Sequence, residues 1–149
     1  QKKSQVFQEE QLDSIAEIIE ESFHDFPTEN IGLTVKFDAK ASIDPYWLKI
    51  CLKNLIENSI RYGKSPIEVF LDGSESEVII TVQDGGEIPY LNMKELLKAK
   101  HKNSVGLGIG LSIVYKTIKQ MGGKITLEPN PTRFTIRIPR SRNGKNFSS

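Results

Sequence analysis

The chain has 149 residues, of which 38% are hydrophobic and 26% charged, and this composition suits one globular domain with a buried core. Its 20 basic and 19 acidic residues leave a net charge of +1, which gives no reason to expect a nucleic acid or an anionic membrane as partner. The single cysteine, Cys51, excludes an internal disulfide, and no apolar run approaches the ~20 residues that a membrane span needs.

The N-terminal part of the chain predicts a helix, a strand and the start of a second helix. Pro27 closes the first helix, which we expect to be scaffold, with His24 in a surface pair. Residues 33–37 alternate as a strand, and Asp44 and Pro45 then suit the cap and first position of the second helix. One face of the first helix is apolar at helical spacing: Leu12, Ile15, Ile19, Phe23 and Phe26.

The second helix, predicted over 45–62, carries an apolar face that includes Cys51 and, on roughly the opposite side, Asn54, Asn58 and Arg61 with Tyr62 beside them. Asparagine is a mediocre helix former, so two of them at i and i+4 need an explanation. They form either a solvated face or a site for a hydrated metal ion, with an amide oxygen as ligand and the arginine facing phosphate.

Two strands are predicted next, at 67–71 and 77–82, and the second is β-branched, which suits a central position in a sheet. It runs into a turn that begins Asp84-Gly85-Gly86. Such a sequence is commonly a plain turn. Alternatively, the strand holds the Asp84 carboxylate where it accepts a hydrogen bond from an exocyclic amine such as that of adenine. Residues 90–104 are polar and basic, and form either a solvated loop, a short helix or a mobile lid over a polyphosphate.

Glycines alternate at the start of a third helix, which ends at Gly122-Gly123 and is followed by strands at 124–127 and 133–138. The missing side chains allow backbone N–H groups to approach a bulky anion at the positive end of the helix. The segment is either a plain close-packing loop or a phosphate cradle, and it matches neither the dinucleotide fingerprint nor the Walker pattern. The glycines are Gly106, Gly108 and Gly110, and the apolar stripe behind them is Leu107, Leu111, Val114, Ile118 and Met121.

Three elements stand in a telling order: the helix with the two asparagines, the turn after Asp84, and the glycine-spaced start of the third helix. In this order they resemble the catalytic ATP-binding domain of sensor histidine kinases. That domain belongs to the superfamily that also holds type II topoisomerases, the ninety-kilodalton heat-shock chaperone and mismatch-repair ATPases. The resemblance is carried by LKICLKNLIENSIRY, VQDGGEIP and GLGIGLSIVYKTIKQMGGKI, and it covers about residues 12–139. It implies a two-layer α/β sandwich (the Bergerat fold) with a mixed, mostly antiparallel sheet, helices on one face, and ATP and Mg²⁺ between the helices and a lid. We expect the domain to span 1–140 and a disordered tail to span 141–149.

The resemblance also implies roles for individual residues. Asn58 matches the magnesium-ligating asparagine and Asn54 the polar residue one turn before it. Arg61 matches a basic residue that meets phosphate, Tyr62 an aromatic beside the nucleotide, and Asp84 the adenine-reading aspartate. The resemblance implies further nucleotide-binding positions at Gly86, Ile88, Lys102, Gly106, Leu107, Gly108, Gly110, Leu111 and Thr132.

The chaperone and topoisomerase branches resemble one another in having a glutamate at the position of Asn54, where it acts as the general base for hydrolysis. Because this chain has an asparagine there, the resemblance favours phosphoryl transfer to a protein side chain over hydrolysis. Glu57, with Asn58, is expected to be catalytic by helping to polarise water or the acceptor histidine. Neither His24 nor His101 lies in a His-Glu-x-x-x-Pro acceptor motif. The resemblance therefore implies a phosphorylated histidine on a separate dimerisation segment upstream, in a two-component phosphorelay that ends at a response regulator.

The chain begins at Gln1 and not at Met, so we expect a piece of a longer protein. We expect the isolated domain to be monomeric and cytoplasmic and the parent to be a homodimer, with anchoring in the inner membrane left open. The turn after Asp84 is one residue shorter than the family's Asp-x-Gly-x-Gly-Ile-Pro, with Glu87 in place of a glycine. Two alternatives stay open: a degenerate domain that serves as a regulatory protein-interaction module, and a serine kinase of the anti-sigma type.

Overall fold

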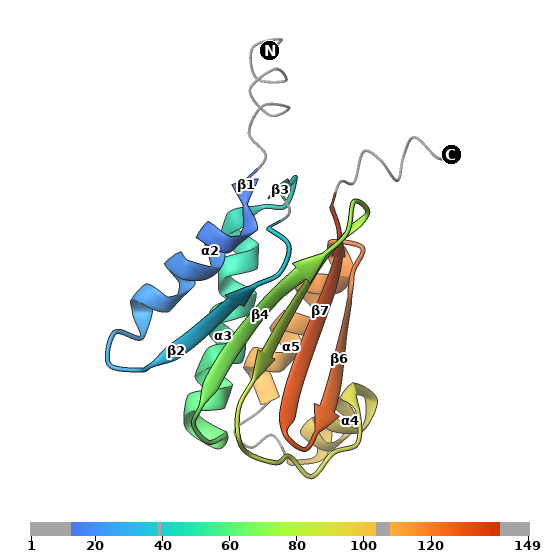
Figure 1. The fold of residues 1–149 in the computed structure, drawn as a ribbon. Helices are drawn as coiled ribbons and strands as arrows, with labels where there is room; N and C mark the ends of the chain where they lie inside the picture. The colour runs from blue at the N-terminus through green and yellow to red at the C-terminus, as the bar shows by residue number, and fades with distance from the viewer. Residues whose placement is uncertain (1–12, 39, 104–107, 141–149) are drawn as a thin grey trace.

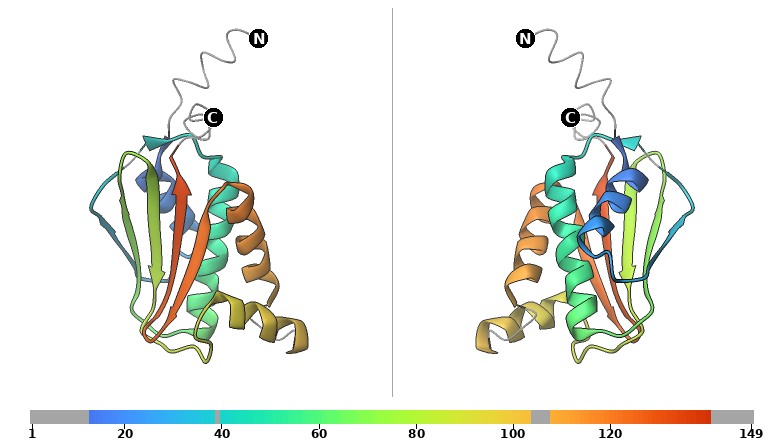
Figure 2. Two further views of the ribbon diagram at one scale, coloured as in Figure 1. Left: turned by 90° about the vertical axis from the view of Figure 1, so that its right-hand side faces the viewer. Right: turned by 90° about the vertical axis from the view of Figure 1, so that its left-hand side faces the viewer.

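The computed structural model of the chain describes residues 13–38, 40–103 and 108–140, which form a sheet covered on one face by helices (Figures 1 and 2). The five strands of this sheet lie in the order β2 (Ile31–Val35), β4 (Ile67–Gly73), β5 (Glu77–Gln83), β7 (Thr132–Pro139) and β6 (Lys124–Pro129). β2 pairs with β4 in parallel and the other neighbours are antiparallel. The predicted fold class, a two-layer sandwich with a mixed, mostly antiparallel sheet, is confirmed.

The helical layer and the smaller elements complete the described part of the chain. Figure 2 shows α4 at the end of the sheet opposite to the two ends of the described chain. Within the described residues no helix combines the length and the apolar character needed to cross a bilayer. The helices are α2 (Ile15–Ser22), the 3₁₀ helix η1 (Phe23–Asp25), α3 (Pro45–Tyr62), α4 (Met93–Asn103) and α5 (Gly108–Gln120), and a two-stranded sheet pairs β1 (Asp13–Ser14) with β3 (Lys40–Ala41).

The core lies between the sheet and the helical layer. Strands β4, β5 and β7 turn alternate residues inward, as their alternation predicted, and these side chains pack against the apolar faces of α3 and α5. Cys51 is one of the fully buried core residues, and burial raises the pKa of its thiol to about 11. This confirms the interpretation of Cys51 as a small buried hydrophobe.

Helix boundaries follow the predicted caps closely. Tyr46 N–H donates to the side chain of Asp44 over 3.0 Å, so α3 begins at Pro45 as predicted. At the end of α5, Gly122 takes a positive φ of 80°, its N–H donates to the carbonyl of Lys119, and Gly123 N–H donates to that of Ile118. The predicted Gly-Gly stop of this helix is therefore confirmed.

One segment differs in its bounds from the prediction, and another adopts one of the predicted alternatives. The strand expected at 33–37 runs from Ile31 to Val35, because parallel pairing with β4 sets its register from Ile31 opposite Ile67 to Val35 opposite Leu71. The basic segment before the glycines contains a helix, α4, which is one of the alternatives that the sequence left open. Its first turn is capped, since Glu95 N–H donates to the Asn92 side chain over 2.9 Å, and its apolar residues Met93 and Leu96 are buried.

Candidate functional site

A cavity of about 100 Å³ opens where α3 ends, β5 ends and β7 begins. Figure 1 shows these three element ends at the same end of the molecule as α4. The cavity therefore collects residues that are far apart in the sequence. Its lining consists of Asn58, Ser59, Tyr62 and Gly63 from α3 and its cap, Glu87, Ile88 and Pro89 with Asp84 from the turn after β5, and Thr132 and Phe134 from β7.

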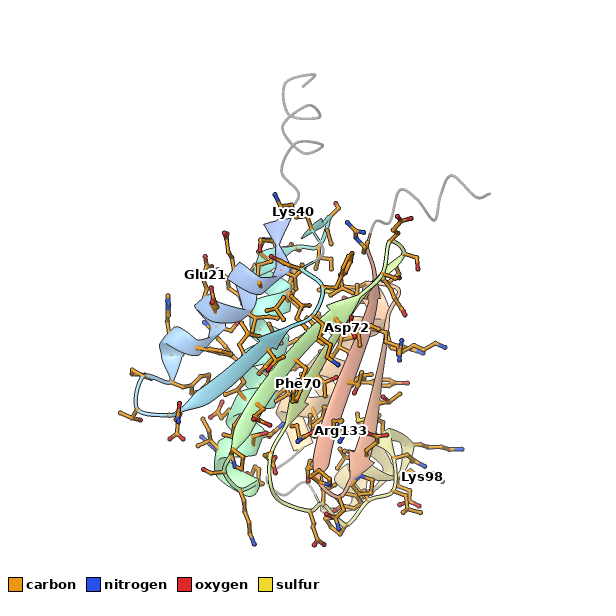
Figure 3. All side chains as sticks on the ribbon, in the orientation of Figure 1. Glu21, Lys40, Phe70, Asp72, Lys98 and Arg133 are labelled. Carbon is orange, nitrogen blue, oxygen red and sulfur yellow. The ribbon has the colours of Figure 1, made fainter. Side chains whose placement is uncertain are left out.

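The other sheet face lies away from this cavity. Figure 3 shows Phe70, Asp72 and Arg133 on the face that the helices leave uncovered. Arg133 donates to Gln83 over 3.0 Å and also pairs with Glu128, so polar contacts across the strands occupy its guanidinium. The guanidinium of Arg133 is therefore engaged within the open sheet face.

Asp84 is held rigidly in the cavity. Its side chain is only 3% exposed, and its Oδ1 accepts hydrogen bonds from the N–H of Gly86 at 2.7 Å and of Lys64 at 3.4 Å. The backbone of the turn is tied to β7, since Asp84 N–H donates to the carbonyl of Thr132 and Thr132 N–H to that of Gly86. No described residue donates to Oδ2, so this oxygen is left to accept from a ligand in the cavity.

Asn58 brings an amide to the same cavity. Among the described residues, its Nδ2 is the one buried side-chain nitrogen or oxygen without a hydrogen-bond partner. Such a group costs about 1–3 kcal/mol when it stays unpaired, so the side chain suits a polar ligand. A half-turn of the amide exchanges its nitrogen and oxygen, so the same position also fits a ligand of a divalent cation through oxygen.

The wider asparagine stripe divides in the structure. Asn54 donates from Nδ2 to the carbonyl of Ile50 at 2.8 Å, and its Oδ1 faces α5, where a Cβ added to Gly110 would lie 2.7 Å away. Arg61 pairs with Glu57 across one helical turn at 2.8 Å, and both are well exposed. The structure brings Asn58 and Tyr62 to the cavity, whereas Asn54 lies against α5 and the Glu57–Arg61 pair lies outside the cavity.

The glycine-rich motif GLGIGLSIVYKTIKQMGGKI is described only in part. Gly106 and Leu107 lie outside the described residues, and so does the side chain of Lys102 in α4. Gly108 and Gly110 belong to the first turn of α5 and not to a preceding loop. Leu111 is buried in the core and does not line the cavity. The predicted phosphate cradle therefore lies partly outside the described residues and stays a prediction.

Of the remaining predicted residues, Ile88 and Thr132 line the cavity and Gly86 is buried beside Asp84. The sequence interpretation missed several lining residues. Phe134 has a readable signal, because it points inward in the alternation of β7. Gly63 carries no local signal of a role in the cavity.

Comparisons with known proteins agree with this geometry. Residues 43–142 match the family model described as histidine kinase-, DNA gyrase B- and HSP90-like ATPase. The chain is 36% identical over 110 residues to the sensor histidine kinase VxrA of Vibrio cholerae and 32% identical over 132 residues to the sensor histidine kinase CssS of Bacillus subtilis. These matches cover 74% and 84% of this chain but only 22% and 29% of the two relatives, so the chain spans less than a third of either.

Among solved structures, the nucleotide-free catalytic domain of the histidine kinase ThkA superposes with a TM-score of 0.72 at 26% identity. That likeness covers 86% of this chain and 95% of the ThkA domain, so most of the fold has a counterpart there. The region that matches the family model includes Asn58 and Asp84, which line the cavity, and the whole of α5. The chain therefore belongs to the family of histidine kinase-, DNA gyrase B- and HSP90-like ATPases.

Proposed function

We propose that this chain is the ATP-binding catalytic domain of a two-component sensor histidine kinase, which presents the γ-phosphoryl group of ATP to a histidine on a separate dimerisation segment. The observation that carries the proposal is the convergence of the Asp84 carboxylate and the Asn58 amide on one cavity. The names of the two relatives described above, both of them sensor histidine kinases, support this branch of the family over the gyrase and chaperone branches.

The adenine end of the site is assigned to Asp84. Its Oδ2 is the acceptor for the exocyclic amine, since Oδ1 is already engaged by Gly86 N–H. The apolar side chains of Ile88 and Phe134 and the ring of Tyr62 line the same cavity and supply contact area for a flat base. An acceptor fixed by the backbone favours adenine, because guanine and hypoxanthine carry a carbonyl oxygen at the corresponding position.

The phosphate end is assigned to Asn58 and the start of α5. Asn58 would hold Mg²⁺ through its amide oxygen, and the ion would supply charge neutralisation on the phosphates. Within the described residues no three His, Cys, Asp or Glu side chains cluster as a metal site, which suits an ion held mainly by phosphate oxygens and water. The positive end of α5 with Gly108, preceded by Lys102 and Gly106, is proposed to face the phosphates.

Transfer is proposed over hydrolysis because the general base of the hydrolysing branches has no equivalent at position 54. An amide cannot take a proton from water, and Asn54 is in any case engaged with Ile50 and faces α5. Glu57 stays a predicted catalytic residue. Its carboxylate lies on Arg61 outside the cavity, so a role toward the acceptor histidine requires it to leave this ion pair.

The parent protein is proposed to be a homodimer that passes the phosphoryl group from its own histidine to a response regulator. Calorimetric titration with Mg-ATP tests the binding step, and transfer of labelled phosphate to the separately expressed upstream segment tests the reaction. We expect binding in both the presence and absence of that segment, and phosphorylation only with it. No measurable heat or thermal shift at millimolar Mg-ATP would contradict the proposal and favour a regulatory module instead.

A further inference from the structure

Gly63, the residue that follows α3, lies directly against the carboxylate of Asp84. A Cβ built on Gly63 would meet Cγ and both oxygens of that carboxylate, with Oδ1 only 2.6 Å away. A real Cβ essentially never approaches another heavy atom within 3.0 Å. Position 63 therefore admits no side chain while the Asp84 carboxylate keeps its place.

The backbone at position 63 does not itself require glycine. Its φ of −100° and ψ of −158° are extended values that any L-residue can adopt. Its N–H donates to the carbonyl of Ser59 at 3.0 Å, a bond that an alanine would also make. The reason for glycine at this helix end therefore lies in the neighbouring carboxylate and not in the cap conformation.

The missing Cβ allows the backbone to close on Asp84 from two sides. Lys64, the next residue, brings its N–H to 3.4 Å from Oδ1, and Gly86 brings its N–H to 2.7 Å from the same oxygen. Gly86 is similarly tight, since a Cβ there would lie 3.0 Å from Oδ1 and 3.3 Å from the Cα of Gly63. With Oδ1 held in this way, Oδ2 is the oxygen that remains for the cavity.

We propose that Gly63 is a positioning residue for adenine recognition: the absence of its side chain sets the Asp84 carboxylate so that Oδ2 meets the exocyclic amine of the base. This inference rests on the proposed function of Asp84.

Alanine at position 63 is expected to disturb the site and not the fold. The atoms that must move are the end of a side chain, so the Asp84 carboxylate can rotate away from the added methyl group. By contrast, a Cβ on Gly85 would lie 2.6 Å from the backbone carbonyl of Ser65, which cannot rotate away. Gly32 offers a matched control, because a Cβ there makes an ordinary contact of 3.8 Å with the Glu68 side chain.

The test compares ATP with purine riboside triphosphate, which lacks the 6-amino group, as ligands of the wild type, Gly63→Ala and Gly32→Ala. We expect the wild type and Gly32→Ala to prefer ATP by roughly 10- to 100-fold. Gly63→Ala should lose about tenfold or more in ATP affinity, keep its affinity for the analogue, and so lose the preference. A merely structural role of Gly63 would weaken both ligands alike.

Each result points to one conclusion. If the wild type binds both nucleotides equally, the assignment of Asp84 to adenine is wrong and this inference falls with it. If the wild type discriminates and Gly63→Ala discriminates to the same degree, the inference alone is overturned. Should Gly63→Ala lower the melting temperature, Asp84→Ala in the same chain must restore it, because the methyl group then meets no carboxylate; failure to restore it would also overturn the inference.

Discussion

Replacing Asp84 with asparagine changes one atom of the cavity from an acceptor to a donor. Oδ1 of the new side chain must remain on the Gly86 N–H, now at 2.7 Å, because the opposite amide orientation would set two donors against each other. Nδ2 then takes the place of Oδ2 and faces the cavity. The exocyclic amine of adenine would meet a second donor, whereas the 6-oxo group of hypoxanthine would meet a suitable one.

The magnitude follows from the loss of one hydrogen bond to a charged acceptor, about 1.5–3 kcal/mol, which is roughly 10- to 100-fold in the dissociation constant. The stability of the fold should change little, because the backbone bonds between the turn and β7 do not involve the replaced atom. We therefore expect Asp84→Asn to bind ATP more weakly by this factor, to gain affinity for ITP, and to keep its melting temperature.

Competition of ATP and ITP for a fluorescent nucleotide measures the change in preference. Asp72→Asn is the matched control, since Asp72 also accepts a backbone N–H at 2.7 Å, from Gly73, but lies on β4 outside the cavity. An unaltered ratio of ATP to ITP affinity in a folded Asp84→Asn variant would refute the assignment of this carboxylate to the base.

Further predictions concern four other positions. Asn58→Ala should abolish Mg²⁺-dependent ATP binding in calorimetry while leaving the melting temperature unchanged or higher, since it removes a buried amide without a partner; normal affinity would exclude the metal role. Gly110→Ala should destabilise the wild type by about 1–2 kcal/mol but stabilise an Asn54→Ala background by about 0.5–1 kcal/mol, because a Cβ built on Gly110 would lie 2.7 Å from Asn54 Oδ1; additive urea midpoints would contradict this. Burial raises the pKa of the Cys51 thiol from 9.0 to about 11, so the thiol of the unfolded state loses its proton at lower pH than that of the folded state. The free energy of unfolding should therefore fall as the pH rises from 9 to about 11. Urea titrations of Cys51→Ala should not show this fall. Arg61→Ala should change stability by no more than about 0.5 kcal/mol, because its ion pair is exposed, so a clear loss of phosphotransfer in that variant would identify a functional role.

Local signals were sufficient where the cause of a structure lies within a few residues. Asp44 with Pro45 marked the start of α3, and Gly122 marked the end of α5, because caps depend on the backbone of the helix end itself. Convergence of Asn58 and Asp84 could be expected only from the resemblance. Neither the spacing of the asparagines nor the turn after β5 says that the end of α3 and the end of β5 meet.

Other features depend on contacts that spacing does not reveal. Arg61 was expected to face phosphate, but an acid four residues earlier on the same helix offers a partner at 2.8 Å, and the guanidinium lies there instead. Asn54 was grouped with Asn58, yet it lies one turn nearer the start of α3 and packs against Gly110. Gly63 carries no signal of its own because the carboxylate that lies against it belongs to Asp84, in the turn after β5, much later in the sequence.

The shortened turn after β5 bears on whether the domain is degenerate. A loss of one residue would matter most if side chains of the turn held Asp84 in place, but its anchors are the N–H groups of Gly86 and Lys64 and the backbone pairing with Thr132. Backbone donors depend on the path of the chain, and here two glycines, Gly63 and Gly86, provide room for that path. The carboxylate is thus buried in the wall of the cavity, its Oδ1 accepts from two backbone N–H groups, and no described residue donates to its Oδ2. The shorter turn is therefore compatible with nucleotide binding and gives no independent support to a purely regulatory module.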